Sequence, residues 1–232
     1  MAAESKWPKA VPELTVEQQQ IREDFMRYWH EELPQRYGLI ERFNHGWPAG
    51  RGSGRTLEIG AGLGEHLRWE TNRAGYVALE LREEMADRLR RAHPDVEVVV
   101  GDCQERLPFP DASFDRVLAV HVLEHLPNLP AALVEARRLL RPGGRLVAVI
   151  PCEGGFVYGL ARRISSQRLF VRRYGVPYDW FIRAEHLNRP QEIRAALADA
   201  GFSEVASRWF PLLLPSVTLN LVLGLELAFG DA

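Results

Sequence analysis

The sequence predicts an α/β fold in which a parallel sheet is covered by helices on both faces. From Arg55 onward, short β-rich runs alternate with amphipathic helical segments, which is the pattern of parallel strands joined by crossover helices. The first run, residues 56–59, leads directly into Gly60, Gly62 and Gly64. Glycine adopts positive φ and lets the backbone approach a bound molecule closely, so this turn predicts a ligand-binding loop.

Length, charge and cysteine content exclude several other classes of protein. A chain of 232 residues is long enough for one domain with a well-buried core and an appendage. The formal net charge of −2 gives no indication of a nucleic-acid partner. Cys103 and Cys152 are too few for a disulfide framework or a cysteine zinc site, and we expect no metal. The N-terminus lacks the apolar run of a secretory signal, so a cytoplasmic location is expected.

Residues 1–50 are predicted to form a helical segment that caps the main domain, residues 51–232. A helix is expected to begin at Thr15, because Thr15 and Gln18 have the spacing of a capping box. Its apolar face would hold Ile21, Phe25, Tyr28 and Trp29. Pro34 would end this helix, and a second short helix would follow. The segment either packs on the domain or also acts as a lid that supplies aromatic side chains to a substrate pocket.

After the glycines, the chain is expected to continue as a helix from His66 and then to alternate regularly. The predicted strands are residues 56–59, 76–81, 96–100, 115–122, 145–150 and 203–210, and the predicted helices are residues 82–93, 129–141 and 190–200. The last helix begins with Pro190 and is followed by Gly201, as helices prefer. In a sheet of this kind, ligands bind beyond the carboxyl ends of the strands, near the switch in strand order.

Residues 152–189 interrupt the alternation and form an insertion after the fifth predicted strand. The insertion is rich in aromatic residues and arginines: Phe156, Tyr158, Phe170, Tyr174, Tyr178, Trp180, Phe181, Arg162, Arg163, Arg168, Arg172 and Arg173. Because it leaves the sheet at the ligand-binding edge, we expect it to shape the substrate pocket. Its arginines either bind a phosphate group or belong to a solvated helix with an apolar inner face.

The tail, residues 211–229, is the most apolar stretch of the chain. Ser216, Thr218 and Asn220 alternate with apolar residues, which predicts a last strand. The tail is barely long enough to span a bilayer and is interrupted by Pro215 and Glu226, so we expect no membrane insertion. It could instead form the interface of a homodimer.

Acidic residues stand at the ends of three consecutive predicted strands. Glu58 precedes the glycines, Glu80 ends the second strand and Asp102 follows the third. Their surroundings resemble the motif series of class I S-adenosylmethionine-dependent methyltransferases, in particular the type 11 group that acts on small molecules. The resemblance covers about residues 55–151 and rests on residues 58–64, 79–80, 101–102, 114–118, 122–125 and 140–144.

The resemblance implies S-adenosylmethionine as the cofactor and a Rossmann-like sheet of seven strands, mostly parallel, with an antiparallel last strand. It implies that the methionine part of the cofactor is wrapped by Gly60, Gly62 and Gly64. Glu58 would lie near the ammonium group of the cofactor.

The resemblance also implies contacts to the nucleoside part of the cofactor. Glu80 would accept hydrogen bonds from both ribose hydroxyls, and its neighbour Leu81 belongs to the same cofactor-binding set. Asp102 would bind the adenine amino group, and the backbone N–H of Cys103 a ring nitrogen. His121, at the end of the fourth strand, would face the sulfonium side.

Methyl transfer from a sulfonium is an in-line displacement that depends mainly on positioning, and it needs a base only if the acceptor carries a proton of high pKa. His121 is the first candidate for this base by position, and His186 is the second. Tyr158 and Tyr178 are further candidates, whereas His125 is expected to be structural.

The predicted function is methyl transfer from S-adenosylmethionine to a small-molecule or lipid- or sugar-linked acceptor. Two alternatives stay open: a nucleic-acid (RNA) methyltransferase, and a partner subunit that binds the cofactor without catalysis. Two further hypotheses are that Cys152 acts as a nucleophile and that the protein is an NAD-dependent oxidoreductase. Glu80 alone would also suit an oxidoreductase, but the spacing of the glycines does not.

Overall fold

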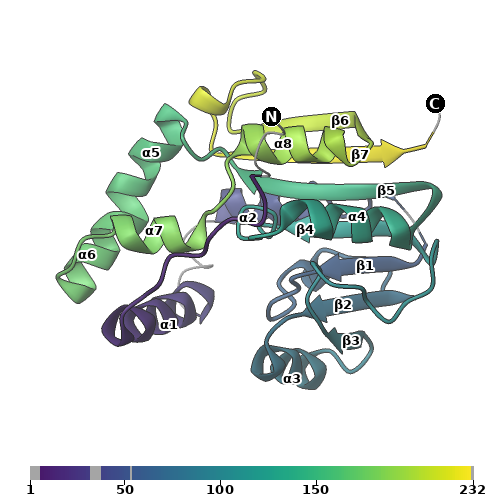
Figure 1. The fold of residues 1–232 in the computed structure, drawn as a ribbon, viewed down its shortest axis with the longest axis horizontal. Helices are drawn as coiled ribbons and strands as arrows, with labels where there is room; N and C mark the ends of the chain where they lie inside the picture. Colours follow the sequence, from purple (N-terminus) through teal and green to yellow (C-terminus); the bar gives the residue numbers. More distant parts are fainter. Residues whose placement is uncertain (1–5, 32–37, 53, 231–232) are drawn as a thin grey trace.

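The structure, a computed structural model, describes residues 6–31, 38–52 and 54–230. Within this part of the chain, seven strands form one sheet in the order β3-β2-β1-β4-β5-β7-β6 (Figure 1). The strands are β1 Thr56–Ile59, β2 Tyr76–Glu80, β3 Glu97–Val100, β4 Phe114–Val120, β5 Leu140–Pro151, β6 Phe202–Phe210 and β7 Val222–Phe229. Strands β1 to β5 pair in parallel, and β7 is antiparallel to both of its neighbours. The predicted mostly parallel, Rossmann-like sheet of seven strands is confirmed.

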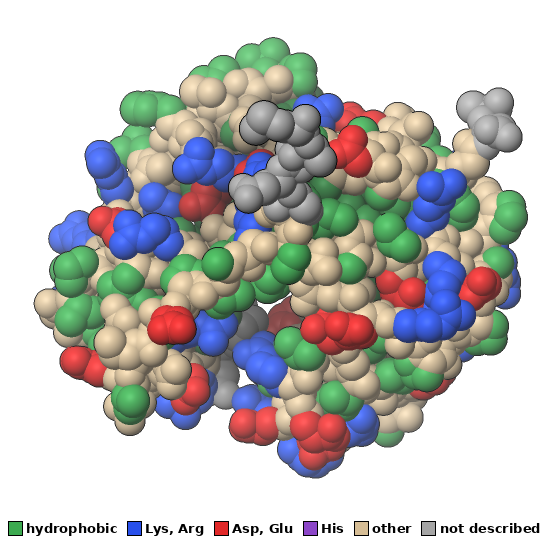
Figure 2. Space-filling view, viewed as in Figure 1, with side chains coloured by type: hydrophobic (Ala, Val, Ile, Leu, Met, Phe, Trp, Pro, Cys, Tyr) green, Lys and Arg blue, Asp and Glu red, His purple; other side chains and the backbone are tan. Residues whose placement is uncertain are grey.

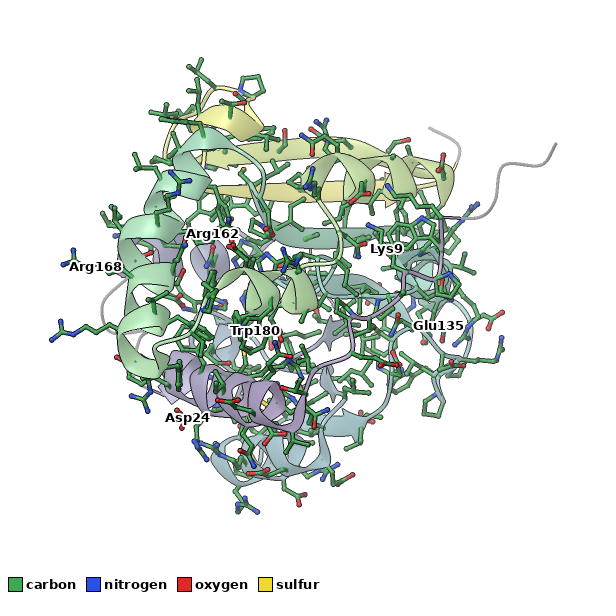
Figure 3. The ribbon with its side chains drawn as sticks, turned by 60° about the vertical axis from the view of Figure 1, so that its left-hand side comes forward. Lys9, Asp24, Glu135, Arg162, Arg168 and Trp180 are labelled. Atoms are coloured by element: carbon green, nitrogen blue, oxygen red, sulfur yellow. The ribbon has the colours of Figure 1, made fainter. Side chains whose placement is uncertain are left out.

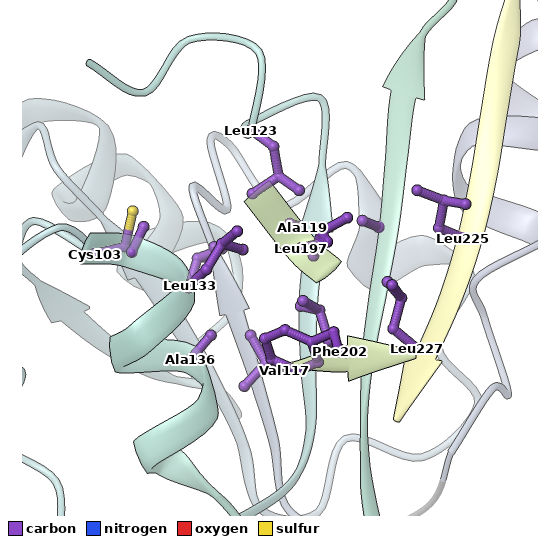
Figure 4. Packing of buried hydrophobic residues seen from close by; sticks show 14 of the residues in the cluster. Cys103, Val117, Ala119, Leu123, Leu133, Ala136, Leu197, Phe202, Leu225 and Leu227 are labelled. Atoms are coloured by element: carbon purple, nitrogen blue, oxygen red, sulfur yellow. The ribbon is translucent and has the colours of Figure 1, made fainter. Parts of the chain in front are cut away.

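Both faces of the sheet are covered by helices, as predicted (Figure 1). On one face, α4 Leu129–Leu139 and α8 Pro190–Asp199 bury the main apolar cluster, which includes Val117, Leu133 and Leu197 (Figure 4). On the other face lie α2 Gly38–Gly46 and α3 Glu83–Ala92, packed on smaller clusters. The alternation of side chains along each strand divides the core between these two layers.

The expected helix after the glycine loop does not form. The segment makes a single 3₁₀ turn, His66–Arg68, in which the N–H of Leu67 bonds to the carbonyl of Gly64 and the N–H of Trp69 to that of His66. Residues 65–75 must also reach the start of β2, and the side chain of His66 turns into the core instead of lying on a helix face. The loop therefore lacks the helix dipole that the sequence had suggested.

The end of the chain also differs from the prediction. The last strand, β7, begins at Val222, and the alternating residues 216–221 form a loop with a 3₁₀ turn, Val217–Leu219. Asn220 closes this loop, because its side chain accepts a hydrogen bond from the N–H of Leu212 and donates to the carbonyls of Leu214 and Ser216. Likewise, β5 begins at Leu140 and not at Arg145.

The N-terminal helix α1, Val16–Glu31, begins with the predicted capping box, in which Thr15 and Gln18 exchange hydrogen bonds of 3.0 and 3.2 Å. Phe25 is buried and packs against the insertion. Pro34 and the side chain of Trp29 lie outside the described residues.

The insertion is helical: α5 Phe156–Arg162, a π-helical turn η3 Arg163–Gln167, α6 Arg168–Tyr174 and α7 Asp179–Glu185. Together with α1 it forms a separate apolar cluster beside the sheet (Figure 1). Among the described residues, no helix is long and apolar enough to cross a membrane.

Candidate cofactor and acceptor site

The glycine loop lies at the switch in strand order, between β1 and β4. Gly60, Gly62 and Gly64 all have positive φ, of 66°, 60° and 84°. A Cβ on Gly60 would lie 2.6 Å from a methyl group of Val122, which follows β4. The loop after β1 and the loop after β4 are therefore in close contact, and only glycine fits between them.

Glu80 is held at the same edge of the sheet. Its Oε2 accepts a hydrogen bond of 3.0 Å from the backbone N–H of Gly62, and its Oε1 accepts two from Arg82, at 3.1 and 3.2 Å. The next residue, Leu81, is 62% exposed. The carboxylate is thus fixed in orientation beside the glycines and next to an exposed apolar side chain.

Asp102 follows β3, the neighbour of β2, and so lies on the side of Glu80 opposite to the glycine loop. Its Oδ1 accepts hydrogen bonds from the backbone N–H and the side-chain amide of Gln104, at 2.9 and 3.0 Å. The neighbouring thiol of Cys103 is buried, and burial raises its pKa to about 12. Burial raises the pKa of the Cys152 thiol to about 12 as well, which argues against a cysteine nucleophile because the thiolate is the reactive form.

Glu58 occupies a buried polar layer beneath α2 and α3. It accepts a hydrogen bond of 2.8 Å from the hydroxyl of Tyr76. Burial raises the pKa of Glu58 to about 8; the charges of Glu65 and Glu70 add to this, whereas Tyr76 and Arg116 oppose it. The Glu58 carboxyl group is therefore buried and hydrogen-bonded to another residue of the protein.

The same layer contains a hydrogen-bonded triad that the sequence did not reveal. Arg116 donates to Glu70 at 2.7 Å, Glu70 also meets His66 at 2.8 Å, and all three side chains are buried. Two of its members, His66 and Glu70, lie in the segment after the glycine loop where a helix was expected.

His121 stands at the end of β4 with a φ of 53°. Positive φ is costly for a residue with a side chain and is concentrated at functional sites. Its Nδ1 lies 3.1 Å from Oε1 of Glu124, and its ring is about one third exposed. With Nδ1–H donated to this carboxylate, Nε2 keeps a lone pair that can accept a proton.

His186 meets His125 on the other side of Glu124. The two rings pack edge to face, with their centroids 5.1 Å apart. The Nδ1 of His125 bonds to the carbonyl of Glu185 at 2.6 Å, and the Nδ1 of His186 bonds to the carboxylate of Glu153. The two predicted base candidates, His121 and His186, thus belong to one cluster.

The electrostatics of this cluster are dominated by carboxylates. Burial alone would raise the pKa of Glu124, but the hydrogen bond with His121 and the nearby histidines lower it to about 2. Burial would lower the pKa of His186, but the bond to Glu153 and the other carboxylates outweigh burial and raise it. Burial also raises the pKa of Tyr178 to about 12 and that of Tyr158 well above its usual value, so both phenols keep their protons at neutral pH.

Glu124 and Glu153, which hold His121 and His186 in this cluster, are the candidate site residues that sequence reasoning missed. Glu124 was visible only as the residue before His125, and Glu153 had no signal of its own. The expectation of no metal considered cysteines alone, whereas Glu124, His125 and His186 offer ligand atoms that all lie within 4.8 Å of one another.

Comparison with known proteins agrees with the fold and the motifs. Residues 57–148 match the family described as "Methyltransferase domain". A fatty-acid O-methyltransferase from Mycolicibacterium smegmatis is 40% identical over 95 residues, which cover 39% of this chain and 34% of that protein. A malonyl-[acyl-carrier protein] O-methyltransferase from Erwinia pyrifoliae is 33% identical over 162 residues, which cover 66% of this chain and 59% of that protein. The chain thus matches between a third and three-fifths of the length of these curated relatives.

Among solved structures, a methyltransferase from Thermotoga maritima, described as a possible histamine N-methyltransferase, superposes with a TM-score of 0.60. It shares 20% sequence identity and covers 91% of this chain and 99% of its own, which shows a common fold. Together with the family match, this leads to one conclusion. Residues 57–148 match a methyltransferase domain, and the chain has the fold of a known methyltransferase.

Proposed function

We propose that the protein transfers a methyl group from S-adenosylmethionine to an oxygen atom of a small-molecule or lipid-linked metabolite. One observation carries the proposal: the loop after β1 touches the loop after β4, so that the glycines and His121 lie at one edge of the sheet. A cofactor held by the glycines would therefore have the His121–Glu124 pair on its acceptor side.

The residues at this edge fit the cofactor. The glycine loop leaves no room for a Cβ at Gly60, and positive φ at all three glycines lets the backbone approach a ligand. The Glu80 carboxylate already has its orientation set by Gly62 and Arg82, and its remaining lone pairs suit a pair of hydroxyls. The exposed Leu81 suits the face of an aromatic base.

The cofactor would supply an activated methyl group on a positively charged sulfur. The protein's part is to place the acceptor oxygen in line and to keep water out. For a carboxylate acceptor no base is needed. For a hydroxyl acceptor, Nε2 of His121 would take the proton, with Glu124 orienting the ring and stabilising the charge that forms on it.

The proposed acceptor class draws on the relatives. The two curated relatives described above are named as O-methyltransferases, one of fatty acids and one of a malonyl group on a carrier protein. His186 directly follows α7, which belongs to the aromatic cluster of α1, α6 and α7; the core of this cluster is buried, and its partly buried members, such as Trp180, are the apolar groups that such a chain could contact.

The first test is calorimetric binding of S-adenosylmethionine and S-adenosylhomocysteine, with NAD as the comparison ligand. We expect micromolar binding of both sulfur compounds, about 100-fold weaker binding by Glu80→Ala, since hydrogen bonds to a charged group contribute roughly 1.5–3 kcal/mol each, and no change in Glu84→Ala, a nearby exposed acid on α3. Preference for NAD, or equal affinity of the two variants, would overturn the assignment.

The second test is turnover with acceptors of defined class: a fatty acid, a malonyl thioester, a hydroxylated aromatic compound and a short RNA. Methylation of a carboxyl or hydroxyl oxygen is expected, and His121→Ala should lower kcat for a hydroxyl acceptor more than for a carboxylate. Methylation of RNA alone would favour the nucleic-acid alternative. If the protein binds the cofactor but methylates none of these acceptors, the alternative of a non-catalytic subunit would be favoured.

A further inference from the structure

The cluster beside His121 has an unsatisfied buried atom. Glu124 is 1% exposed, and while its Oε1 meets His121, its Oε2 has no hydrogen-bond partner among the described residues. A buried carboxylate oxygen without a partner costs free energy, which a positive ligand would recover.

Both neighbouring histidines are prepared as ligands for such a charge. His125 and His186 each use Nδ1 to bond an oxygen, the carbonyl of Glu185 and the carboxylate of Glu153. Histidines that bind metals almost always donate their other N–H in this way. When the two rings are neutral, Nε2 of each then keeps its lone pair, and Nε2 of His125 lies 3.9 Å from Oε1 of Glu124.

The two segments that carry these residues are tied firmly together. Asn188 is buried, and its side-chain amide donates to the carbonyls of Leu123 and Leu126, both at 2.8 Å. The backbone N–H groups of Leu187 and Asn188 donate to the carbonyl of Glu124. The position of His186 relative to Glu124 is therefore set by the fold.

We propose that Glu124, His125 and His186 bind a divalent transition-metal ion, for which zinc is the best match. Two imidazoles and one carboxylate are a ligand set that zinc uses when it keeps a fourth position for water or substrate. Bonds of about 2.0–2.1 Å in a tetrahedron separate the ligand atoms by roughly 3.4 Å, so three atoms within 4.8 Å of one another need only a small contraction. The side chain of His125 is 34% exposed, which leaves a route for the ion.

An ion at this position would also hold an acceptor oxygen next to His121. This role rests on the proposed function, whereas metal binding does not. Binding measured without cofactor or substrate therefore tests the site separately.

The experiment uses the full chain without a histidine tag, stripped with a chelator and dialysed. Zn²⁺ is titrated by calorimetry, and Co²⁺ is followed by its visible absorption, which reports coordination geometry. We expect one ion per chain, micromolar or tighter affinity and an intense tetrahedral Co²⁺ spectrum.

Variants of the proposed ligands and of a neighbouring residue test which side chains bind the ion. Glu124→Gln and His186→Gln should abolish saturable binding. Glu153→Gln, which weakens the orienting bond to His186 and also the ion pair with Arg162, should weaken metal binding about 10- to 100-fold. The control is His45→Gln, whose imidazole meets Glu41 at 3.3 Å in a pair away from the site. Circular dichroism without metal identifies any variant that fails to fold, and Glu153→Gln then decides. No saturable binding by the wild type, or equal binding by all folded variants, would overturn the proposal.

A second, independent observation concerns the outer face of the insertion. Residues 156–174 contain five arginines and no acidic residue. The side of this helical segment that faces solvent carries Phe156, Leu160, Ile164 and Val171 together with Arg163, Arg168 and Arg172. Arg168 points outward, whereas Arg162 lies on the inner side, where it pairs with Glu153 (Figure 3).

The loop before β7 extends this apolar face. Leu212, Leu213 and Leu214 are exposed, and Leu213 is 75% exposed. The loop packs against the start of α5, where a Cβ on Gly155 would collide with the backbone of Val217. Figure 2 shows hydrophobic side chains gathered over this part of the molecule, with basic side chains beside them.

We infer that this face docks on an anionic lipid bilayer. A helix with exposed large apolar side chains, several arginines and no acids has the composition of an interfacial helix. The arginines complement anionic headgroups, and the leucines and Phe156 would enter the headgroup–acyl boundary.

Vesicle sedimentation tests this inference with phosphatidylcholine alone and with added phosphatidylglycerol. We expect binding only to the anionic vesicles, weakened by salt, by Arg168→Gln and several-fold by Phe156→Ser or Leu213→Ser. Leu39→Ser, at an equally exposed leucine on α2, is the control and should bind normally. No binding to anionic vesicles, or a dimer in solution that Leu213→Ser dissociates, would overturn the lipid assignment, the latter in favour of a second copy of the chain.

Discussion

The proposed cofactor edge, around the glycine loop, and the proposed acceptor side, formed by α1 and the insertion, are built in different ways. At the cofactor edge, partners are close in sequence: Gly62 bonds to Glu80, 18 residues away, and Asp102 to Gln104, two residues away. On the acceptor side, Tyr174 bonds to Asp24 across 150 residues, and Arg22 to Glu185 across 163. The hydrogen bonds at the first region are thus mostly local, although the glycine loop also contacts Val122, whereas the second region depends on long-range packing of α1 on the insertion.

This difference implies that the two regions can be perturbed separately. Among the described residues, the apolar cluster of α1, α6 and α7 includes no residue of the glycine loop, whereas Glu58 of the polar layer lies in β1, which leads into that loop. The following predictions test that separation, beginning with the largest expected effect.

Phe25→Ala should be the most damaging change on the acceptor side. Phe25 is buried, with its ring centroid 5.0 Å from that of Phe170 and 5.2 Å from that of Phe181. Its removal leaves a cavity, and we expect the free energy of unfolding to fall by about 3–5 kcal/mol. Urea denaturation measures this, and Phe156→Ala, at an exposed phenylalanine, is the control. Cofactor affinity of the folded fraction should stay unchanged; a matching loss of affinity would show that the two regions are coupled.

Gly60→Ala should damage the cofactor edge. The new Cβ would have a φ of 66° and would lie 2.6 Å from Val122. Backbone strain and the collision together cost about 2 kcal/mol, which we expect to appear as a cofactor affinity at least tenfold weaker. Calorimetry of Gly60→Ala/Val122→Ala checks the mechanism, because removing the collision should recover part of the loss. If the double variant binds no better, the close approach of the two loops is not the cause.

Glu58→Gln should stabilise the protein at neutral pH. The pKa of Glu58 is raised to about 8 in the folded protein, chiefly by burial. Between its ordinary pKa and about 8 the unfolded chain loses this proton and the folded protein keeps it, so stability is lost as the pH rises through this window. Glutamine can accept the hydrogen bond from Tyr76 without that cost, and we expect a gain of about 2 kcal/mol at pH 8.

Denaturation of wild type and Glu58→Gln at several pH values checks this. The two proteins should differ little below the ordinary pKa of glutamate, and the difference should grow toward pH 8. A variant less stable than the wild type at every pH would mean that the charged carboxylate is required in this layer.

Asp24→Asn should have the smallest effect. The hydrogen bond from Tyr174, 2.6 Å long, and those from Arg27 and Arg173 lower the pKa of Asp24 to about 2. This stabilisation is present above the ordinary pKa of aspartate and is lost as the pH falls toward 2. Because the side chain is about one third exposed, solvent screening limits the loss in Asp24→Asn to less than about 1 kcal/mol at pH 7.

Thermal unfolding at pH 7 and at pH 3 measures this effect, with Glu23→Gln at the preceding exposed residue as the control. The difference from wild type should shrink at the lower pH. A loss of several kcal/mol would instead make Asp24 a main attachment of α1 to the insertion.

The sequence by itself determined the sheet, the glycine loop and the positions of Glu58, Glu80 and Asp102 at strand ends. These features depend on alternation along a strand and on turn chemistry, both of which act over a few residues. The same local reasoning was wrong for the helix after the glycine loop and for a strand at residues 216–221. There, buried partners such as Arg116 and the bonds of Asn220 outweighed the local pattern.

Only the tertiary structure decided the acceptor side. Glu124, His125 and His186 come together because Asn188 ties the end of the insertion to the loop after β4. The tertiary structure also divided the apolar tail into an inner strand, β7, and an exposed loop that contains Leu212, Leu213 and Leu214. Contacts between segments far apart in the chain leave no periodic or motif signal, because the distance between them in sequence carries no information about their distance in space.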